Sequence, residues 1–304
     1  MKKTSNIIII LVLFLVACEK EVKIPIEYTT PKLVVNALFN TDSLWDVEIS
    51  ASRYIYDTNP IPLIDDAEVN ILDSEGNNFE LTNQGEGIYT SSTEKPQTGK
   101  TYSIEVNHDN YENARSTNKL PGGIIIDNIE WHEEVYVSGD LFRKINVTFQ
   151  DSQEKDYYLI RMSGAFWEEI IDPLTGLSDS GLVIHPIYFF SQNAAVEEIN
   201  SHSPQSSISF IDELFNGDQY TIDLLLYEFY FNNQPEWEVG LESIYISLSK
   251  ISEEYYLYQK SYQKYQNSSG NTLFSQPTQV YTNIENGLGI FAGYSNSVDT
   301  INIK

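Results

Sequence analysis

Cys18 is the only cysteine of the chain, and its surroundings predict that it is a site of lipid attachment. Basic residues follow Met1, an unbroken apolar run extends from Ile7 to Ala17, and Cys18 comes directly after it. This order is typical of a secretory signal, and cleavage before Cys18 would expose the thiol and amino group that become acylated. The run is too short to span the ~30 Å of bilayer hydrocarbon, which needs roughly 20 residues. We therefore interpret residues 1–17 as a lipoprotein signal peptide; an ordinary signal peptide with an incidental cysteine is the alternative.

The other residues of chemical interest form no recognisable catalytic or metal-binding motif. Four histidines lie far apart in unlike contexts, and none belongs to a His-Glu-x-x-His zinc motif: His108, His132, His185 and His202. His132 and Glu133 are the nearest approach to a metal cluster. However, neighbouring residues of a strand point to opposite faces, so these two side chains do not converge on one ion. The sequence has neither a Gly-x-Ser-x-Gly nucleophile elbow nor a Gly-x-x-x-x-Gly-Lys phosphate loop. It therefore predicts no catalytic residue, no metal ligand and no cofactor.

Trp237 is the best candidate for a contact with a ligand. It follows the polar residues 232–236 (NNQPE), where a buried partner for an indole is hard to identify. Exposed aromatic rings beside amides and carboxylates suit contacts with sugars or peptides. The alternative is that Trp237 folds back over the edge of a sheet. Trp131 and Trp167 lie in alternating strand patterns, so we expect both in the core.

The composition limits the partners and favours one fold class. The chain has 44 acidic and 18 basic residues, a net charge of −26, which repels nucleic acid and anionic headgroups. This acidity serves solubility or, alternatively, attracts cations or a basic partner. With Cys18 used by the anchor, no thiol remains for disulfides or for cysteine-based metal sites. A content of 21 Tyr, 14 Phe and 4 Trp favours half-buried pleated surfaces, so we predict a mainly β protein.

The first part of the folded chain has the pattern of an immunoglobulin-like β-sandwich. We place a tether at residues 18–27 and the sandwich at residues 28–120, where short alternating segments are separated by turn residues. Tyr102, Ile104 and Val106 alternate with polar residues, so their period of two predicts that all three point inwards.

Residues 121–304 begin with a Pro-Gly-Gly sequence, and we expect them to form a separate, larger β-rich domain with one principal helix. The helix is predicted over Ser252–Tyr265, with its first serine as N-cap and two glutamates in the first turn. Residues recur there at spacings of four and three, so they form one stripe: Ile251, Tyr255, Tyr258, Tyr262 and Tyr265. We expect the helix to pack through Tyr255, Tyr258 and Tyr262. We expect this stripe to be buried against a sheet; a platform for a ligand is the alternative.

Near the C-terminus, Asn286-Gly287 lies between two apolar segments and predicts a hairpin turn. Gly289 and Gly293 interrupt the second segment, which indicates that another backbone passes close to it. We therefore expect a structural role for this region.

Five segments together carry a resemblance to a known family. They are CEKE at residues 18–21, PKLVV at 31–35, DELFNG at 212–217, ISEEYY at 251–256 and NIENGLGIF at Asn283–Phe291. They resemble a family of Bacteroidota lipoproteins classified as a domain of unknown function, family four-two-four-nine. The likeness extends over essentially the whole mature chain, and the last segment is its most specific part.

The resemblance implies a lipid anchor and a β-rich body, and members of the family are often encoded beside TonB-dependent outer-membrane receptors. It implies an outer-membrane accessory protein that captures a ligand or caps a transporter, and it brings no catalytic residues. The charged residues 19–21 favour the cell surface over the periplasmic face. A cell-surface hydrolase acting on glycan or peptide is the alternative function.

The anchor can be tested directly with Cys18→Ser. Without the thiol no acyl group can be attached, so we expect the variant to lose labelling by a fatty-acid analogue and to leave the membrane fraction. Equal membrane retention of the variant and the wild-type protein would contradict the predicted anchor.

Overall fold

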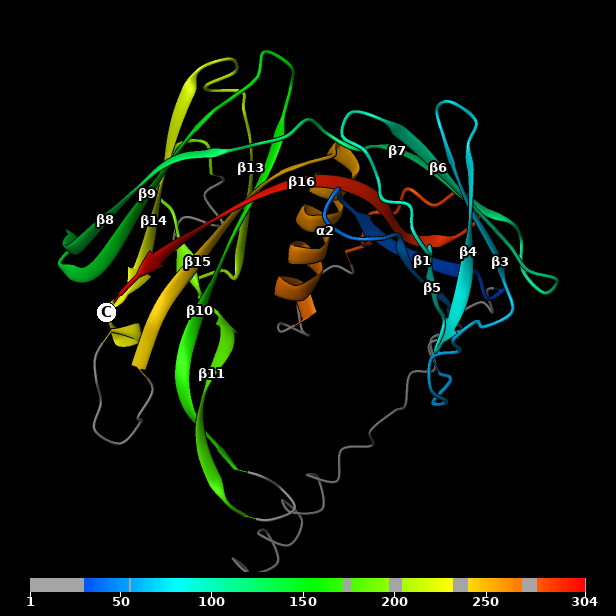
Figure 1. Cartoon of the computed structure of the whole chain (residues 1–304), viewed down its shortest axis with the longest axis horizontal. Coiled ribbons are helices and arrows are strands. Elements are labelled where there is room, and N and C mark those ends of the chain that lie inside the picture. The colour runs from blue at the N-terminus through cyan, green and yellow to red at the C-terminus, as the bar shows by residue number, and fades with distance from the viewer. Residues whose placement is uncertain are drawn as a thin grey trace, which may run out of the picture.

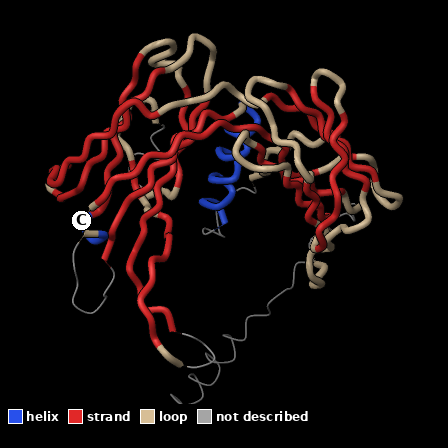
Figure 2. Tube along the Cα trace, in the orientation of Figure 1, coloured by secondary structure: helices blue, strands red, loops and turns tan. Residues whose placement is uncertain are grey.

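The computed structural model describes residues 30–303, except residue 55 and residues 172–175, 197–203, 232–239 and 270–277. This part of the chain is mainly β, with one long helix between two groups of strands (Figure 1 and Figure 2). The predicted fold class is therefore confirmed. No helix within these residues has both the length and the apolar character needed to cross a bilayer.

The N-terminal group of strands forms one curled sheet. It contains β1 (Leu33–Phe39), β2 (Asp46–Ala51), β3 (Glu68–Asp73), β4 (Asn78–Gly85), β5 (Ile88–Thr90), β6 (Thr101–Asn107) and β7 (Ala114–Lys119). The hydrogen-bonded order is β1-β2-β5-β4-β3-β6-β7. We expected the two separate sheets of an immunoglobulin-like sandwich, but β4 joins them. Its first half pairs with β3 and its second half with β5, and an irregularity between Asn83 and Gly85 bends it.

This curled sheet encloses the first hydrophobic core. Tyr102, Ile104 and Val106 are at most 2% exposed, so the predicted register of this strand is confirmed. The ring of Trp45 lies 4.8 Å from that of Tyr102 and 6.4 Å from that of Phe291, measured between centroids. Because Phe291 comes from the far end of the chain, the C-terminal segment completes the N-terminal core.

The C-terminal group of strands is a sandwich of two sheets. One sheet has the order β11-β10-β15-β16, with β13 also paired to β10, and the other has the order β12-β14-β9-β8. The elements are β8 (Ile126–Val137), β9 (Asp140–Gln150), β10 (Tyr157–Ile171), β11 (Ser178–Pro186), β12 (Phe189–Phe190), β13 (Ser207–Ile211), β14 (Gln219–Tyr227), the 3₁₀ turn η2 (Glu228–Tyr230), β15 (Gly240–Ile251) and β16 (Leu288–Asn302).

The two faces of β10 have different neighbours. Tyr158, Ile160 and Met162 point into the second core, between the two sheets of the sandwich. Tyr157 and Leu159 point outwards, where the helix α2 (Glu253–Ser269) covers them. The helix therefore covers the outer face of this sheet only at the start of β10, and β10 continues beyond the helix.

The strand β16 belongs to both groups. Residues 288–293 pair in parallel with β1, and the rest of the strand pairs antiparallel with β15. We expected everything after residue 120 to form a separate body, and we expected a hairpin around Asn286-Gly287. A turn is present there, since the Gly287 N–H donates to the Ile284 carbonyl. However, residues 280–282 form no strand, and the partner of the second segment is β1.

The helix α2 confirms its predicted start and only part of its predicted burial. The Ser252 hydroxyl accepts a hydrogen bond from the Tyr255 N–H at 3.3 Å, as expected of an N-cap. Along the tyrosine stripe Tyr255 is 1% exposed and Tyr258 is partly buried, but Tyr262 is 40% exposed. Tyr265, the last residue of the stripe, is 48% exposed. The prediction of a buried stripe is therefore wrong at Tyr262 and Tyr265, because this end of the helix extends past the residues that cover Tyr255.

Gly289 tests the close approach of β16 to β1. It has a φ of +102°, and an added Cβ would overlap the carbonyl oxygen of Val35. We expect Gly289→Ala to lower the free energy of unfolding by about 3 kcal/mol or more, because backbone strain adds to a backbone clash. Gly139 is the matched control, since its φ is +96° with open space around the same position.

Gly139→Ala should cost only about 1–2 kcal/mol, the penalty of the left-handed backbone. Urea unfolding of the two variants measures both effects. Equal losses would contradict the close approach at Gly289.

Candidate functional site

The structure describes only some of the residues singled out in the sequence. Cys18 and Trp237 lie outside the described residues, as does His202. Trp131 is partly buried, with its ring 5.3 Å from that of Phe231. Trp167 is 37% exposed, so its expected place in the core is wrong. It lies near the end of the sheet, where β10 still has both neighbours: Trp167 pairs with Leu182 of β11 and with Gly240 of β15. Beyond this point β10 continues with β11 alone as a hairpin (Figure 1).

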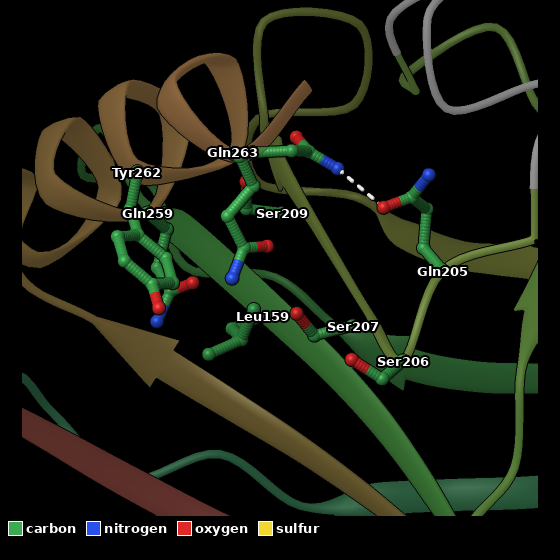
Figure 3. Close-up of a pocket in the computed structure, with 9 residues that line it drawn as sticks. Leu159, Gln205, Ser206, Ser207, Ser209, Gln259, Tyr262 and Gln263 are labelled. Atoms are coloured by element: carbon green, nitrogen blue, oxygen red, sulfur yellow. Dashed lines mark hydrogen bonds between the residues drawn. The ribbon is translucent and has the colours of Figure 1, made fainter. Parts of the chain in front are cut away.

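A groove opens where α2 lies over the outer face of the C-terminal sheet. It contains a cavity of about 220 Å³ between the second half of the helix and the strands β10 and β13 (Figure 3). The helix contributes Gln259, Tyr262, Gln263 and Gln266. The sheet side contributes Leu159, Ser207 and Ser209, together with Gln205 and Ser206 from the loop before β13.

The helix side of the groove follows from residue spacing. Gln259, Tyr262, Gln263 and Gln266 occur at i, i+3, i+4 and i+7, so they share one face of α2. The ring of Tyr262 is parallel to that of Tyr258, with an interplanar angle of 4° and centroids 6.0 Å apart. Burial raises the pKa of Tyr258. The ring of Tyr262 lies beside that of Tyr258 at the cavity wall.

The sheet side follows from the strand register. Leu159 pairs with Ser209, and directly opposite residues of an antiparallel pair lie on the same face. Leu159 is 1% exposed and forms an apolar floor. Across the opening, the Gln263 amide donates to the Gln205 side-chain oxygen at 2.8 Å. The helix and the loop before β13 are therefore connected directly at this point.

A second, larger cavity of about 400 Å³ adjoins the first and shares Ser206 and Ser207 with it. Arg161 and Tyr245 line this cavity, and the Arg161 guanidinium donates to the Tyr255 hydroxyl at 2.6 Å. The guanidinium is thus held in place from beneath the helix. The two cavities form one groove along the outer face of the sheet, which we call the α2 groove.

A cluster of buried acids lies at the end of the sandwich, outside the α2 groove. Carboxylate oxygens of Asp151, Asp156 and Asp212 lie within 4.8 Å of one another, and all three side chains are buried. Oxygen donors of this kind suit a calcium ion. However, the Lys250 ammonium already forms an ion pair with Asp156, and the Tyr158 hydroxyl donates to Asp151.

Main-chain N–H groups also donate to two carboxylates of this cluster. The Gly217 N–H donates to Asp151 at 2.7 Å, and the Asp156 N–H donates to Asp212 at 2.6 Å. Burial is the main reason why the pKa of Asp212 is raised. The cluster therefore connects the loops before β10 and after β13 to β15, which is a structural role.

Sequence reasoning missed the α2 groove, although one signal for it was present. The glutamines of α2 share a face with Tyr262, and a run of amides on one face is unusual for a helix packed on a sheet. The contribution of the loop at Gln205 and Ser206 could not be found from the sequence, because it depends on how β13 pairs with β10.

Comparison with known proteins identifies the family. The chain belongs to the family described as Domain of unknown function (DUF4249), whose model matches residues 19–300. This confirms the domain of unknown function that the sequence segments indicated. No relative was found among the curated proteins.

The solved structures provide a distant likeness. One similar chain is described as "Biofilm associated protein - B domain"; it is 8% identical, and the match covers 89% of this chain and 86% of that chain with a TM-score of 0.21. A likeness at this TM-score supports no conclusion about function.

The contacts of the acid cluster predict that the protein loses much of its stability when the Lys250 ammonium is removed. Lys250→Met leaves the three buried carboxylates without their ammonium partner, so we expect a loss of about 3–5 kcal/mol in the free energy of unfolding. Lys119→Met, at an exposed position, is the matched control and should change stability by no more than about 0.5 kcal/mol. Urea unfolding measures both variants, and similar effects at the two lysines would contradict the role of Lys250.

Proposed function

We propose that this protein is a lipid-anchored, non-enzymatic binding protein of the outer membrane, which works with a TonB-dependent receptor in ligand capture. The proposal rests above all on the α2 groove. There α2 covers only part of the outer face of the C-terminal sheet, and the rest of that face remains open beside the helix. Concave sites lined by a few polar groups and an aromatic ring are typical of ligand binding. The signal sequence before Cys18 and the family resemblance support the location.

The β10–β11 hairpin supports contact with a protein partner. Trp167 pairs with Leu182, so both lie on one face of the hairpin, and the pairing of Ala165 with Ile184 places Ile184 on the same face. Leu182 is 46% exposed and Ile184 is 54% exposed. Adjacent exposed apolar side chains on an open sheet face mark an interaction surface. We propose that this face contacts the receptor.

A cell-surface hydrolase is the second candidate, and two histidine–carboxylate pairs favour it. The Nε2 atom of His108 lies 2.9 Å from Asp66, and that of His185 lies 2.7 Å from Glu168. A histidine oriented by a carboxylate can act as a general base. However, among the described residues neither pair lines the α2 groove, so neither histidine adjoins the polar groups of that groove. We therefore favour binding over catalysis.

Affinity purification from native outer membranes tests the partnership. We expect the wild-type protein to recover a TonB-dependent receptor, and we expect Leu182→Ser/Ile184→Ser to reduce the recovery several-fold, because the exposed apolar face is lost. Ile61→Ser is the matched control, since Ile61 is 56% exposed on the N-terminal group. Failure to recover a receptor, together with turnover of an offered glycan or peptide, would favour the hydrolase instead.

A further inference from the structure

We propose that the α2 groove binds an uncharged oligosaccharide, with one sugar ring in each of its two cavities. This inference deepens the proposed function and rests on it, because it names the class of ligand that the groove captures. The charge, the hydrogen-bonding groups and the shape of the groove support it.

The smaller cavity has no charged side chain in its lining. All nine of the residues around it are glutamine, serine, tyrosine or leucine, although the whole chain carries a net charge of −26. The acidic surroundings repel an anionic ligand, and the cavity offers no carboxylate to pair with a cationic one. An electrically neutral ligand is therefore the one that fits this part of the groove.

The polar groups of the cavity match sugar hydroxyls. A glutamine amide carries N–H donors and an acceptor, and the Gln263 amide uses one of its donors for Gln205. A serine hydroxyl can donate or accept. Sugar hydroxyls also do both, so they can pair with either kind of group. Tyr262, which is 40% exposed, adds an aromatic surface at the same wall. A sugar ring has polar edges and apolar C–H faces, and this combination provides partners for both.

The shape of the groove favours a chain of sugars over a single ring. The smaller cavity, at about 220 Å³, is below the roughly 300–1,000 Å³ that encloses a drug-sized ligand. The second cavity continues beyond Ser206 and Ser207 and offers Tyr245 and the Arg161 guanidinium. Because the Tyr255 hydroxyl holds Arg161, its remaining N–H groups are positioned to donate to a second ring.

A peptide is the competing ligand, and the groove suits it less well. Extended peptides are mostly bound by main-chain hydrogen bonds along the edge of a sheet. The walls of the α2 groove consist of side chains from a helix on one side and of an outward sheet face on the other. The groups that face the ligand are therefore amides and hydroxyls of side chains.

Affinity electrophoresis of the full mature protein tests the ligand class. Gels containing starch, mannan, xylan or mixed-linkage β-glucan serve as neutral probes, and polygalacturonate serves as the acidic probe. We expect at least one neutral polysaccharide, and not polygalacturonate, to retard the protein. Tyr262→Ala and Gln263→Ala should each weaken binding about tenfold, because each removes one contact of ordinary strength.

Two further variants keep this test decisive. Tyr265→Ala changes the same residue type on the same helix, but Tyr265 is 48% exposed and does not line either cavity, so binding should be unchanged. Tyr262→Phe keeps the ring and should retain most of the binding even if Tyr262→Ala is destabilised. Equal weakening by the Tyr262 and Tyr265 alanine variants would overturn the proposed site.

Other outcomes separate the ligand class from the proposed function. Retardation by polygalacturonate alone, or binding of a neutral extended peptide such as a polyglutamine–serine peptide in place of every glycan, would overturn the oligosaccharide proposal. The receptor should still be recovered with the Tyr262→Ala protein, since the β10–β11 face is intact. If the wild-type protein recovers no receptor, that result would instead count against the proposed partnership.

Discussion

The parallel pairing of β1 with β16 is the constraint on which the rest of the structure depends. It joins the first strand of the fold to the last, so the N-terminal core is complete only when the C-terminal segment adds Phe291 to it. The same strand continues beside β15 in the C-terminal sandwich. Glycine at position 289 permits this arrangement, because no side chain fits between its backbone and the carbonyl of Val35.

The position of α2 follows from this shared strand. The helix connects β15 to the segment that precedes β16, so its start is fixed where the two groups of strands meet. Asn118 of β7 contributes to this junction: it accepts the Gly293 N–H and donates to Glu254 in the first turn of α2. With its first turn held in this way, the helix lies over Tyr157 and Leu159, and its second half forms one wall of the α2 groove.

Local features of the sequence predicted local structure well. The period of two at Tyr102, Ile104 and Val106, the cap at Ser252 and the close approach at Gly289 depend on neighbouring residues or on space at one atom, so a single sequence contains the signal. The parallel partner of β16 and the exposure of Tyr262 could not be predicted, because both depend on segments that are distant in the sequence. The meeting of Asp151 and Asp156 with Asp212 has the same cause.

One face of β10 connects the two proposed binding surfaces. Its outward residues lie beneath α2 at Leu159, line the groove at Arg161 and reach the apolar hairpin at Trp167. Because successive outward residues are two positions apart along one strand, a ligand in the groove and a partner on the hairpin would lie side by side on a single rigid element. A receptor bound at the hairpin would then adjoin the open end of the groove, so a captured ligand would have only a short distance to move between the two proteins.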